Sequence, residues 1–86
     1  LNAQFKMEMN NKMFRGYLFK VQESGKFHYV KEPPMTGRGN IICGRVYPYE
    51  GRKSHMSISP KGTVQMFAYK TFEEIKESMD MLKEIS

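Results

Sequence analysis

The side chains best suited to holding a metal ion or attacking a substrate are two histidines and one cysteine. They are His28, Cys43 and His55. A structural zinc site places such ligands about three to five residues apart in pairs, and these three lie much further from one another. We therefore predict no metal site. Cys43 falls within an expected strand, where a cysteine acts as a small packing residue rather than a nucleophile.

The sequence also lacks the motifs that are typical of enzymes. The chain has no nucleophile elbow, P-loop or dinucleotide fingerprint. Glu73 and Glu74 are adjacent, but they open an expected helix, where carboxylates cap the helix and oppose its dipole. Gly37-Arg38-Gly39 resembles part of a phosphate-binding loop, yet no helix is expected after it. We predict that the protein is not an enzyme and uses no cofactor.

The charges are distributed unevenly along the chain. The formal net charge is +5, from 14 Lys and Arg against 9 Asp and Glu. Residues 71–86 contain five acids and two bases, which leaves twelve bases and four acids, or +8, in residues 1–70. A basic body of this kind favours a polyanionic partner such as nucleic acid, although a well-solvated lysine-rich surface would have the same composition.

Length and apolar content limit the class of protein to which the chain can belong. With 86 residues, 40% of them hydrophobic, the chain suits one globular domain. It lacks the run of about 18 apolar residues that a membrane span requires, and it has no secretory segment. We expect an intracellular protein, in the cytoplasm or nucleus, with no membrane partner. Because the sequence begins at Leu1, we also expect it to be part of a longer chain.

The coarse pattern of elements is mostly β. Residues 1–12 are expected to be a loosely ordered lead-in, with a short strand near Phe5–Met9, and residues 13–86 to form the domain. Aromatic and β-branched side chains favour strands at 13–21 and 27–30, paired as a hairpin. Three further strands are expected at 40–47, 54–59 and 63–70. Pro60-Lys61-Gly62 has the residues of a tight hairpin turn between the last two.

From Thr71 onward the apolar period changes from two residues to 3.6. Thr71 and Glu74 fit a capping box, and one apolar stripe follows: Phe72, Ile75, Met79, Leu82 and Ile85. Strands without intervening helices, then a helix, indicate an α+β fold. We predict a curved antiparallel sheet of about five strands with the C-terminal helix packed on one face.

The two faces of that sheet should differ. In the last hairpin, Met56, Ile58, Val64, Met66 and Ala68 alternate onto the helix side. The opposite side receives polar and aromatic residues, namely His55, Ser57, Ser59, Gln65, Phe67 and Tyr69, and Arg45 and Tyr47 join them in the simplest register. Such a face suits nucleic acid, with cations on phosphates and rings on bases, but it equally suits burial by a protein partner.

The second half of the chain also resembles one repeat of the TATA-binding protein family. The resemblance runs through Ile41-Ile42-Cys43-Gly44-Arg45-Val46, the basic turn Gly51-Arg52-Lys53, the strand Met56-Ser57-Ile58-Ser59, and the stretch from Gly62 through Lys70-Thr71 into Glu73-Glu74. It implies a DNA-binding sheet, with Gln65 and Phe67 at the family's groove-contacting positions. It also implies a partner repeat, from a homodimer or from elsewhere in the parent chain.

These observations lead to one functional hypothesis and one rival. We expect a nucleic-acid-binding module, for duplex DNA rather than RNA. Its phosphate contacts would be Arg45, Arg52, Lys53 and Lys61, and its groove or base contacts Tyr47, Gln65, Phe67 and Tyr69. The rival is a protein-interaction or oligomerisation module whose sheet face is buried by a partner, with Phe67 and Tyr69 as its anchors.

Overall fold

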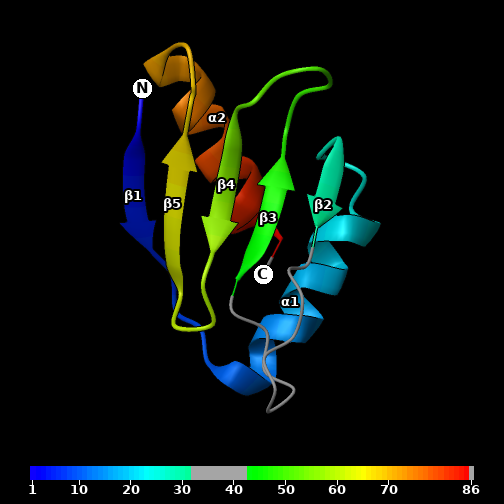
Figure 1. Cartoon of the computed structure of the whole chain (residues 1–86). Helices are drawn as coiled ribbons and strands as arrows, with labels where there is room; N and C mark the ends of the chain where they lie inside the picture. The colour runs from blue at the N-terminus through cyan, green and yellow to red at the C-terminus, as the bar shows by residue number, and fades with distance from the viewer. Residues whose placement is uncertain (32–42, 86) are drawn as a thin grey trace.

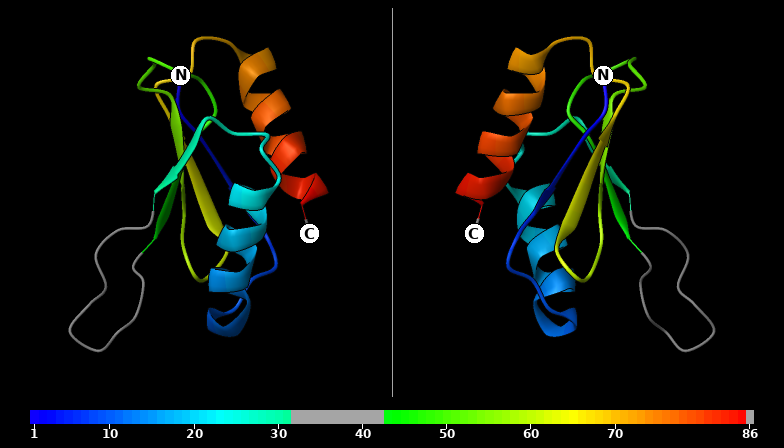
Figure 2. Two further views of the ribbon diagram at one scale, coloured as in Figure 1. Left: turned by 90° about the vertical axis from the view of Figure 1, so that its right-hand side faces the viewer. Right: turned by 90° about the vertical axis from the view of Figure 1, so that its left-hand side faces the viewer.

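A five-stranded antiparallel sheet is covered on one face by two helices (Figures 1 and 2). The computed structural model describes residues 1–31 and 43–85. Along the chain its elements are β1 (Ala3–Lys6), α1 (Asn11–Glu23), β2 (Tyr29–Lys31), β3 (Gly44–Tyr47), β4 (His55–Ile58), β5 (Thr63–Phe67) and α2 (Phe72–Glu84). The strands lie in the order β1-β5-β4-β3-β2. The predicted α+β class is therefore confirmed. The expected loop around Arg38, and the first three residues of the strand expected at 40–47, lie outside the described residues.

The core lies between the sheet and the two helices. Alternate residues of β4 and β5 point into it, and Met56, Ile58, Val64 and Met66 are all fully buried. This follows from the period of two in a strand, which sends every second side chain to the same face. The helices close the core from the other side (Figure 2), so one sheet face is covered and the other is open.

Helix α2 begins where the sequence predicts. The Thr71 side chain accepts a hydrogen bond from the Glu74 backbone N–H at 3.2 Å, which is the first half of the capping box. In a complete capping box the Glu74 carboxylate would accept a hydrogen bond from the Thr71 N–H. Here it accepts one from the Lys70 N–H instead. Ile75 and Leu82 are buried, but Phe72 is 74% exposed. The buried stripe therefore starts at Ile75, one turn later than expected.

The strand expected at 13–21 is wrong, because these residues belong to α1. Asn10 caps this helix by accepting from the Met13 N–H at 3.0 Å. The buried residues are Phe14, Tyr17, Leu18 and Val21, a helical spacing that the β-favouring residue types concealed. The predicted hairpin with residues 27–30 is wrong for the same reason. Strand β2 pairs with β3 instead.

The first residues are part of the sheet rather than a loose lead-in. Strand β1 pairs with β5, and Ala3 lies opposite Met66 and Phe5 opposite Val64. Both are partly buried and pack against the core, while Gln4 and Lys6 are exposed. The short strand expected near Phe5–Met9 therefore lies earlier in the chain, at Ala3–Lys6, where it pairs with the edge of β5.

Candidate nucleic-acid interface

The open face of the sheet carries two rows of side chains that run across the strands. Register brings Tyr29 opposite Tyr47, and His55 opposite Phe67. We call the four residues Tyr29, Tyr47, His55 and Phe67 the aromatic row. Two residues further along each strand, a second row contains Lys31, Arg45, Ser57, Gln65 and Gln4, which we call the polar row. Strands β2, β3, β4 and β5 each contribute one residue to both rows, and β1 contributes Gln4 to the polar row.

The aromatic row is a continuous stack. Ring centroids are 6.0 Å apart for Tyr29 and Tyr47, 5.4 Å for Tyr47 and His55, and 5.2 Å for His55 and Phe67. The corresponding interplanar angles are 43°, 33° and 31°. The inner rings, Tyr47 and His55, therefore each have a ring neighbour on both sides.

His55 adds a polar atom to that row. Its Nδ1 lies 2.9 Å from the Lys53 carbonyl oxygen. Because a carbonyl oxygen can only accept, Nδ1 carries the proton in the neutral ring and Nε2 is the acceptor. The row thus combines apolar rings with tyrosine hydroxyls and an imidazole nitrogen, which can hydrogen-bond to base edges.

The open face of the sheet and helix α2 differ in charge. The open-face positions of the strands include the cations Lys6, Lys31 and Arg45, and no carboxylate occupies any of these positions within the described strands. Helix α2, on the covered side, contains five of the nine acids of the chain: Glu73, Glu74, Glu77, Asp80 and Glu84. A polyanion would therefore meet its complement on the open face.

Most of the predicted site residues lie on or beside this face. Arg45, Tyr47, Gln65 and Phe67 occupy it as expected. Lys53 is exposed just before β4, near the aromatic row, and Lys61 is exposed in the β4–β5 turn at the opposite end of the sheet. The two lysines therefore flank the face at its two ends.

The placement of Tyr69 on this face is wrong. Ala68 has a φ of +60°, which breaks the alternation of β5 immediately before Tyr69. The Tyr69 side chain consequently turns to the helix side, where it is 2% exposed and packs edge-on against Tyr49. Burial raises the pKa of its hydroxyl to about 12. Tyr69 is a core residue and is inaccessible to a ligand on the open face.

Arg52 is engaged inside the domain rather than projecting to a ligand. Its two terminal nitrogens donate to the two carboxylate oxygens of Glu74 at 2.6 and 2.9 Å. The guanidinium lies 4.4 Å above the Tyr49 ring and also donates to Ser54. This bidentate pair ties the β3–β4 connection to the first turn of α2. The sequence-based assignment of Arg52 to phosphate contact is therefore replaced by a structural role.

The Arg52–Glu74 pair predicts a specific acid sensitivity. Hydrogen bonding from Arg52 lowers the pKa of Glu74 from 4.5 to about 2. A carboxyl group with a lowered folded-state pKa stabilises the fold above its unfolded pKa, and this contribution is lost as the pH falls from about 4.5 towards 2. Between about pH 4.5 and pH 2 we expect the melting temperature of Glu74→Gln to fall less than that of the wild type.

The matched control for that experiment is Glu73→Gln, which removes the same charge from an exposed neighbouring position. Melting temperatures of the wild type and both variants should be followed by circular dichroism in steps of pH. A Glu74→Gln profile as steep as that of Glu73→Gln would contradict the role assigned to the pair.

A hollow of about 270 Å³ lies at the β2 end of the aromatic row. It is lined by His28, Tyr29, Lys31, Tyr47, Tyr49, Gly51 and Arg52. Tyr29 and Lys31 are site residues that the sequence reasoning missed. Their signal was their alternation with Val30, but it could be used only once β2 was paired with β3. The hollow extends the open face with aromatic and cationic side chains.

Comparisons with known proteins identify no relative. No protein-family model, curated protein or solved structure matches the chain. Within residues 1–31 and 43–85, no three of the His, Cys, Asp and Glu side chains gather as a metal site would require. No helix in those ranges is long and apolar enough to cross a membrane.

Proposed function

We propose that this domain binds nucleic acid, with duplex DNA as the expected ligand, through the open face of its sheet. The observation that carries the proposal is the pairing of a continuous aromatic row with a neighbouring row of cations and amides. Cations provide sequence-independent attraction to phosphates, and rings and amides contact the bases or sugars. The absence of carboxylates from the open-face positions of the described strands adds to the case.

The spacing of the rings favours a duplex over a stacked single strand. A single-stranded site uses exposed ring faces as platforms for successive bases. Here Tyr47 and His55 each have a ring neighbour on both sides, with centroids 5.2 to 6.0 Å apart, which leaves no room for a base between the rings. Aromatic side chains beside Gln65 and Ser57 are suited to the floor and walls of a groove, where base edges are read.

The order of elements gives further support. The repeat of the TATA-binding protein family has a helix between its first strand and the next, and α1 lies at that point of this chain, between β1 and β2. This agreement lies in the first half of the chain, outside the region that carried the sequence resemblance. Among the described strands, none pairs with the outer edge of β1. A second repeat or a second copy could extend the sheet there.

The proposal is tested by fluorescence anisotropy of a labelled AT-rich duplex at low and moderate salt. We expect affinity to fall steeply with salt, because bound cations release counterions from the phosphates. The double variant Lys31→Ala/Arg45→Ala should weaken binding to all sequences. It should also reduce the slope of log K against log salt by about 2, roughly one for each lost phosphate contact.

A charge-matched control separates this site from general basicity. Lys20→Ala/Lys76→Ala also removes two exposed cations, but from α1 and α2 on the covered side. It should leave the slope close to that of the wild type. Equal effects of both double variants would mean diffuse attraction without a defined site. No binding at low salt would overturn the proposal and favour the protein-interaction module.

A further inference from the structure

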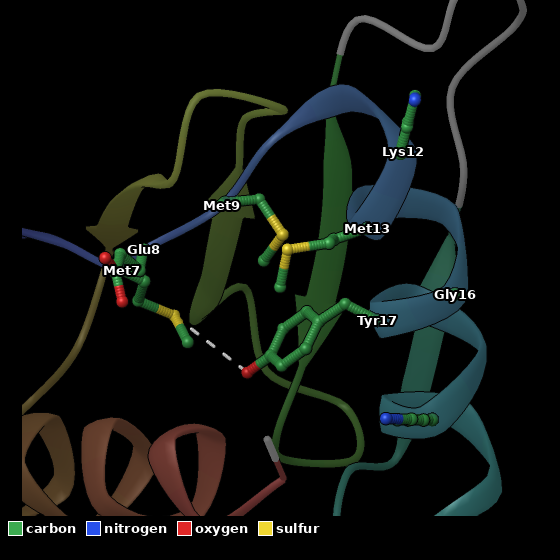
Figure 3. Close-up of a pocket in the computed structure, with 8 residues that line it drawn as sticks. Met7, Glu8, Met9, Lys12, Met13, Gly16 and Tyr17 are labelled. Atoms are coloured by element: carbon green, nitrogen blue, oxygen red, sulfur yellow. Dashed lines mark hydrogen bonds between the residues drawn. The ribbon is translucent and has the colours of Figure 1, made fainter.

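Three of the eight methionines occur within seven residues, at Met7, Met9 and Met13. This segment connects β1 to α1 and includes the first turn of the helix. All three residues line one hollow of about 280 Å³. Figure 3 shows the side chains of Met9 and Met13 converging there, with Met7 reaching towards the same hollow from the β1 side. We call these three residues the methionine cluster.

Core packing accounts for only part of the methionine cluster. Met56 and Met66 show what core methionines look like here, since both are completely buried. Met13, by contrast, is 53% exposed, and Met7 and Met9 are partly buried where they pack against the core. The three side chains also line a surface hollow, where a solute can reach them.

The sulfur atoms of the cluster keep most of their capacity to bind a ligand. The Tyr17 hydroxyl lies 3.9 Å from Met7 Sδ, but its single proton is donated to the Leu82 carbonyl oxygen at 2.6 Å. Asn10 Nδ2 lies 3.3 Å from Met13 Sδ, and thioethers are weak acceptors of hydrogen bonds. These contacts orient two of the sulfurs without saturating them.

We propose that the methionine cluster binds a soft monovalent cation, Cu(I) or its analogue Ag(I). Thioethers are soft, neutral ligands that select Cu(I), whereas Mg²⁺ and Ca²⁺ prefer oxygen. Glu8, Lys12 and Lys20 also line the hollow, so the affinity for the cation has to come from the sulfur ligands rather than from net charge. In Figure 3 the Lys12 side chain points away from the sulfurs of Met9 and Met13. This site is separate from the open face of the sheet, so it does not depend on the proposed function.

The direct test follows the methionine methyl groups by NMR during titration with silver nitrate. The protein would carry ¹³C-methyl methionine and the substitution Cys43→Ser, because the sulfur of Cys43 would otherwise compete for Ag(I). We expect the signals of Met7, Met9 and Met13 to shift together and to saturate at one Ag(I) per chain. Shifts confined to the other methionines would overturn the proposal.

Substitution with leucine separates ligation from apolar packing. Met9→Leu and Met13→Leu keep side-chain volume and hydrophobicity but remove the sulfur, and such exchanges are tolerated well. Loss of an outer-shell partner already costs about 10- to 100-fold in metal affinity, so loss of a ligand should cost at least as much. The control is Met79→Leu on α2, outside the cluster, which should bind Ag(I) like the parent.

The same series should be repeated with Cu(I) under anaerobic conditions, against a chromophoric chelator of known affinity. The two leucine variants should again lose the metal first. Leucine variants that bind both metals as tightly as the Met79→Leu control would show that the cluster is an apolar patch and no metal site. Circular dichroism of each variant confirms that the comparison is made between folded proteins.

Discussion

Replacing Gly62 with alanine is expected to lower the melting temperature of this domain by about 10–20 °C. Gly62 has a φ of +94°, a region that L side chains rarely adopt. A Cβ at this position would also collide with the backbone carbonyl oxygen of Met7. The Met7 N–H donates to the Gly62 carbonyl at 2.7 Å, and this bond joins the end of β1 to the β4–β5 turn. Backbone strain and a disrupted hydrogen bond together should cost about 3 kcal/mol or more.

Two other glycines provide graded controls for Gly62→Ala. Gly51 also has a positive φ, +72°, but an added Cβ would meet nothing within 4 Å. Gly51→Ala should therefore show the cost of backbone conformation alone, about 1 kcal/mol. Gly16 lies within α1 with open space around it, so Gly16→Ala should stabilise the helix by about 0.5–1 kcal/mol. If thermal denaturation placed Gly62→Ala level with Gly51→Ala, the close approach to Met7 would be refuted.

Replacing Tyr47 with alanine is expected to weaken binding of the AT-rich duplex by about 30-fold, which corresponds to about 2 kcal/mol. Tyr47 is central to the aromatic row, with Tyr29 on one side and His55 on the other. Its removal would take away a ring, leave Tyr29 without its ring neighbour and leave His55 with Phe67 alone. Aromatic residues at the centre of an interface are the ones whose truncation costs most. Anisotropy titration at one fixed salt concentration measures the effect.

Two matched variants show whether the loss belongs to the aromatic row. Phe19→Ala also removes a ring, but from the surface of α1, where Phe19 is 63% exposed. It should leave binding unchanged. Tyr47→Phe keeps the stack and removes only the hydroxyl, so its binding should fall between those of the wild type and Tyr47→Ala. Equal losses for Phe19→Ala and Tyr47→Ala would remove the open face from consideration as the site.

The rival hypothesis, a protein-interaction module, makes a different prediction about the same face. A partner that buries the aromatic row should appear as a stable dimer or hetero-complex, which a measurement of mass in solution detects. The sequence named Phe67 and Tyr69 as the anchors of such an interface, and Tyr69 is excluded because it lies in the core. Phe67 stays on the open face, and Tyr29, which is 53% exposed, takes the place of Tyr69 as a candidate.

The parts of the fold that could be predicted are those with local causes. Helix α2 begins at a threonine whose side chain caps it, and β4 and β5 are joined by a turn in which a glycine supplies the positive φ. Their alternation places Met56, Ile58, Val64 and Met66 in the core, as expected. Each of these features depends on residues that are close in the chain, so the residue types are enough to identify them.

The elements whose type, position or pairing was predicted wrongly depend on partners far away in the chain. Residues 13–21 have β-favouring side chains, and their helical state is decided by burying Phe14, Tyr17, Leu18 and Val21 against the sheet. Strand β1 is too short to be stable by itself and forms because β5 offers an open edge. Strand β2 is placed by its pairing with β3, about 15 residues away in the chain.

The candidate site likewise has features with local causes and features that depend on contacts between distant segments. The sequence by itself determined the basic body, the acidic α2 and the residues that alternate along β4 and β5, because composition and a period of two are local properties. Tertiary structure alone decided which of these residues meet. It placed Tyr29 and Lys31 beside Tyr47 and Arg45, drew Arg52 to Glu74, and turned Tyr69 into the core after a single residue of positive φ. Register, ion pairing and one backbone dihedral are set by contacts between distant segments, which the residue pattern of a single strand does not encode.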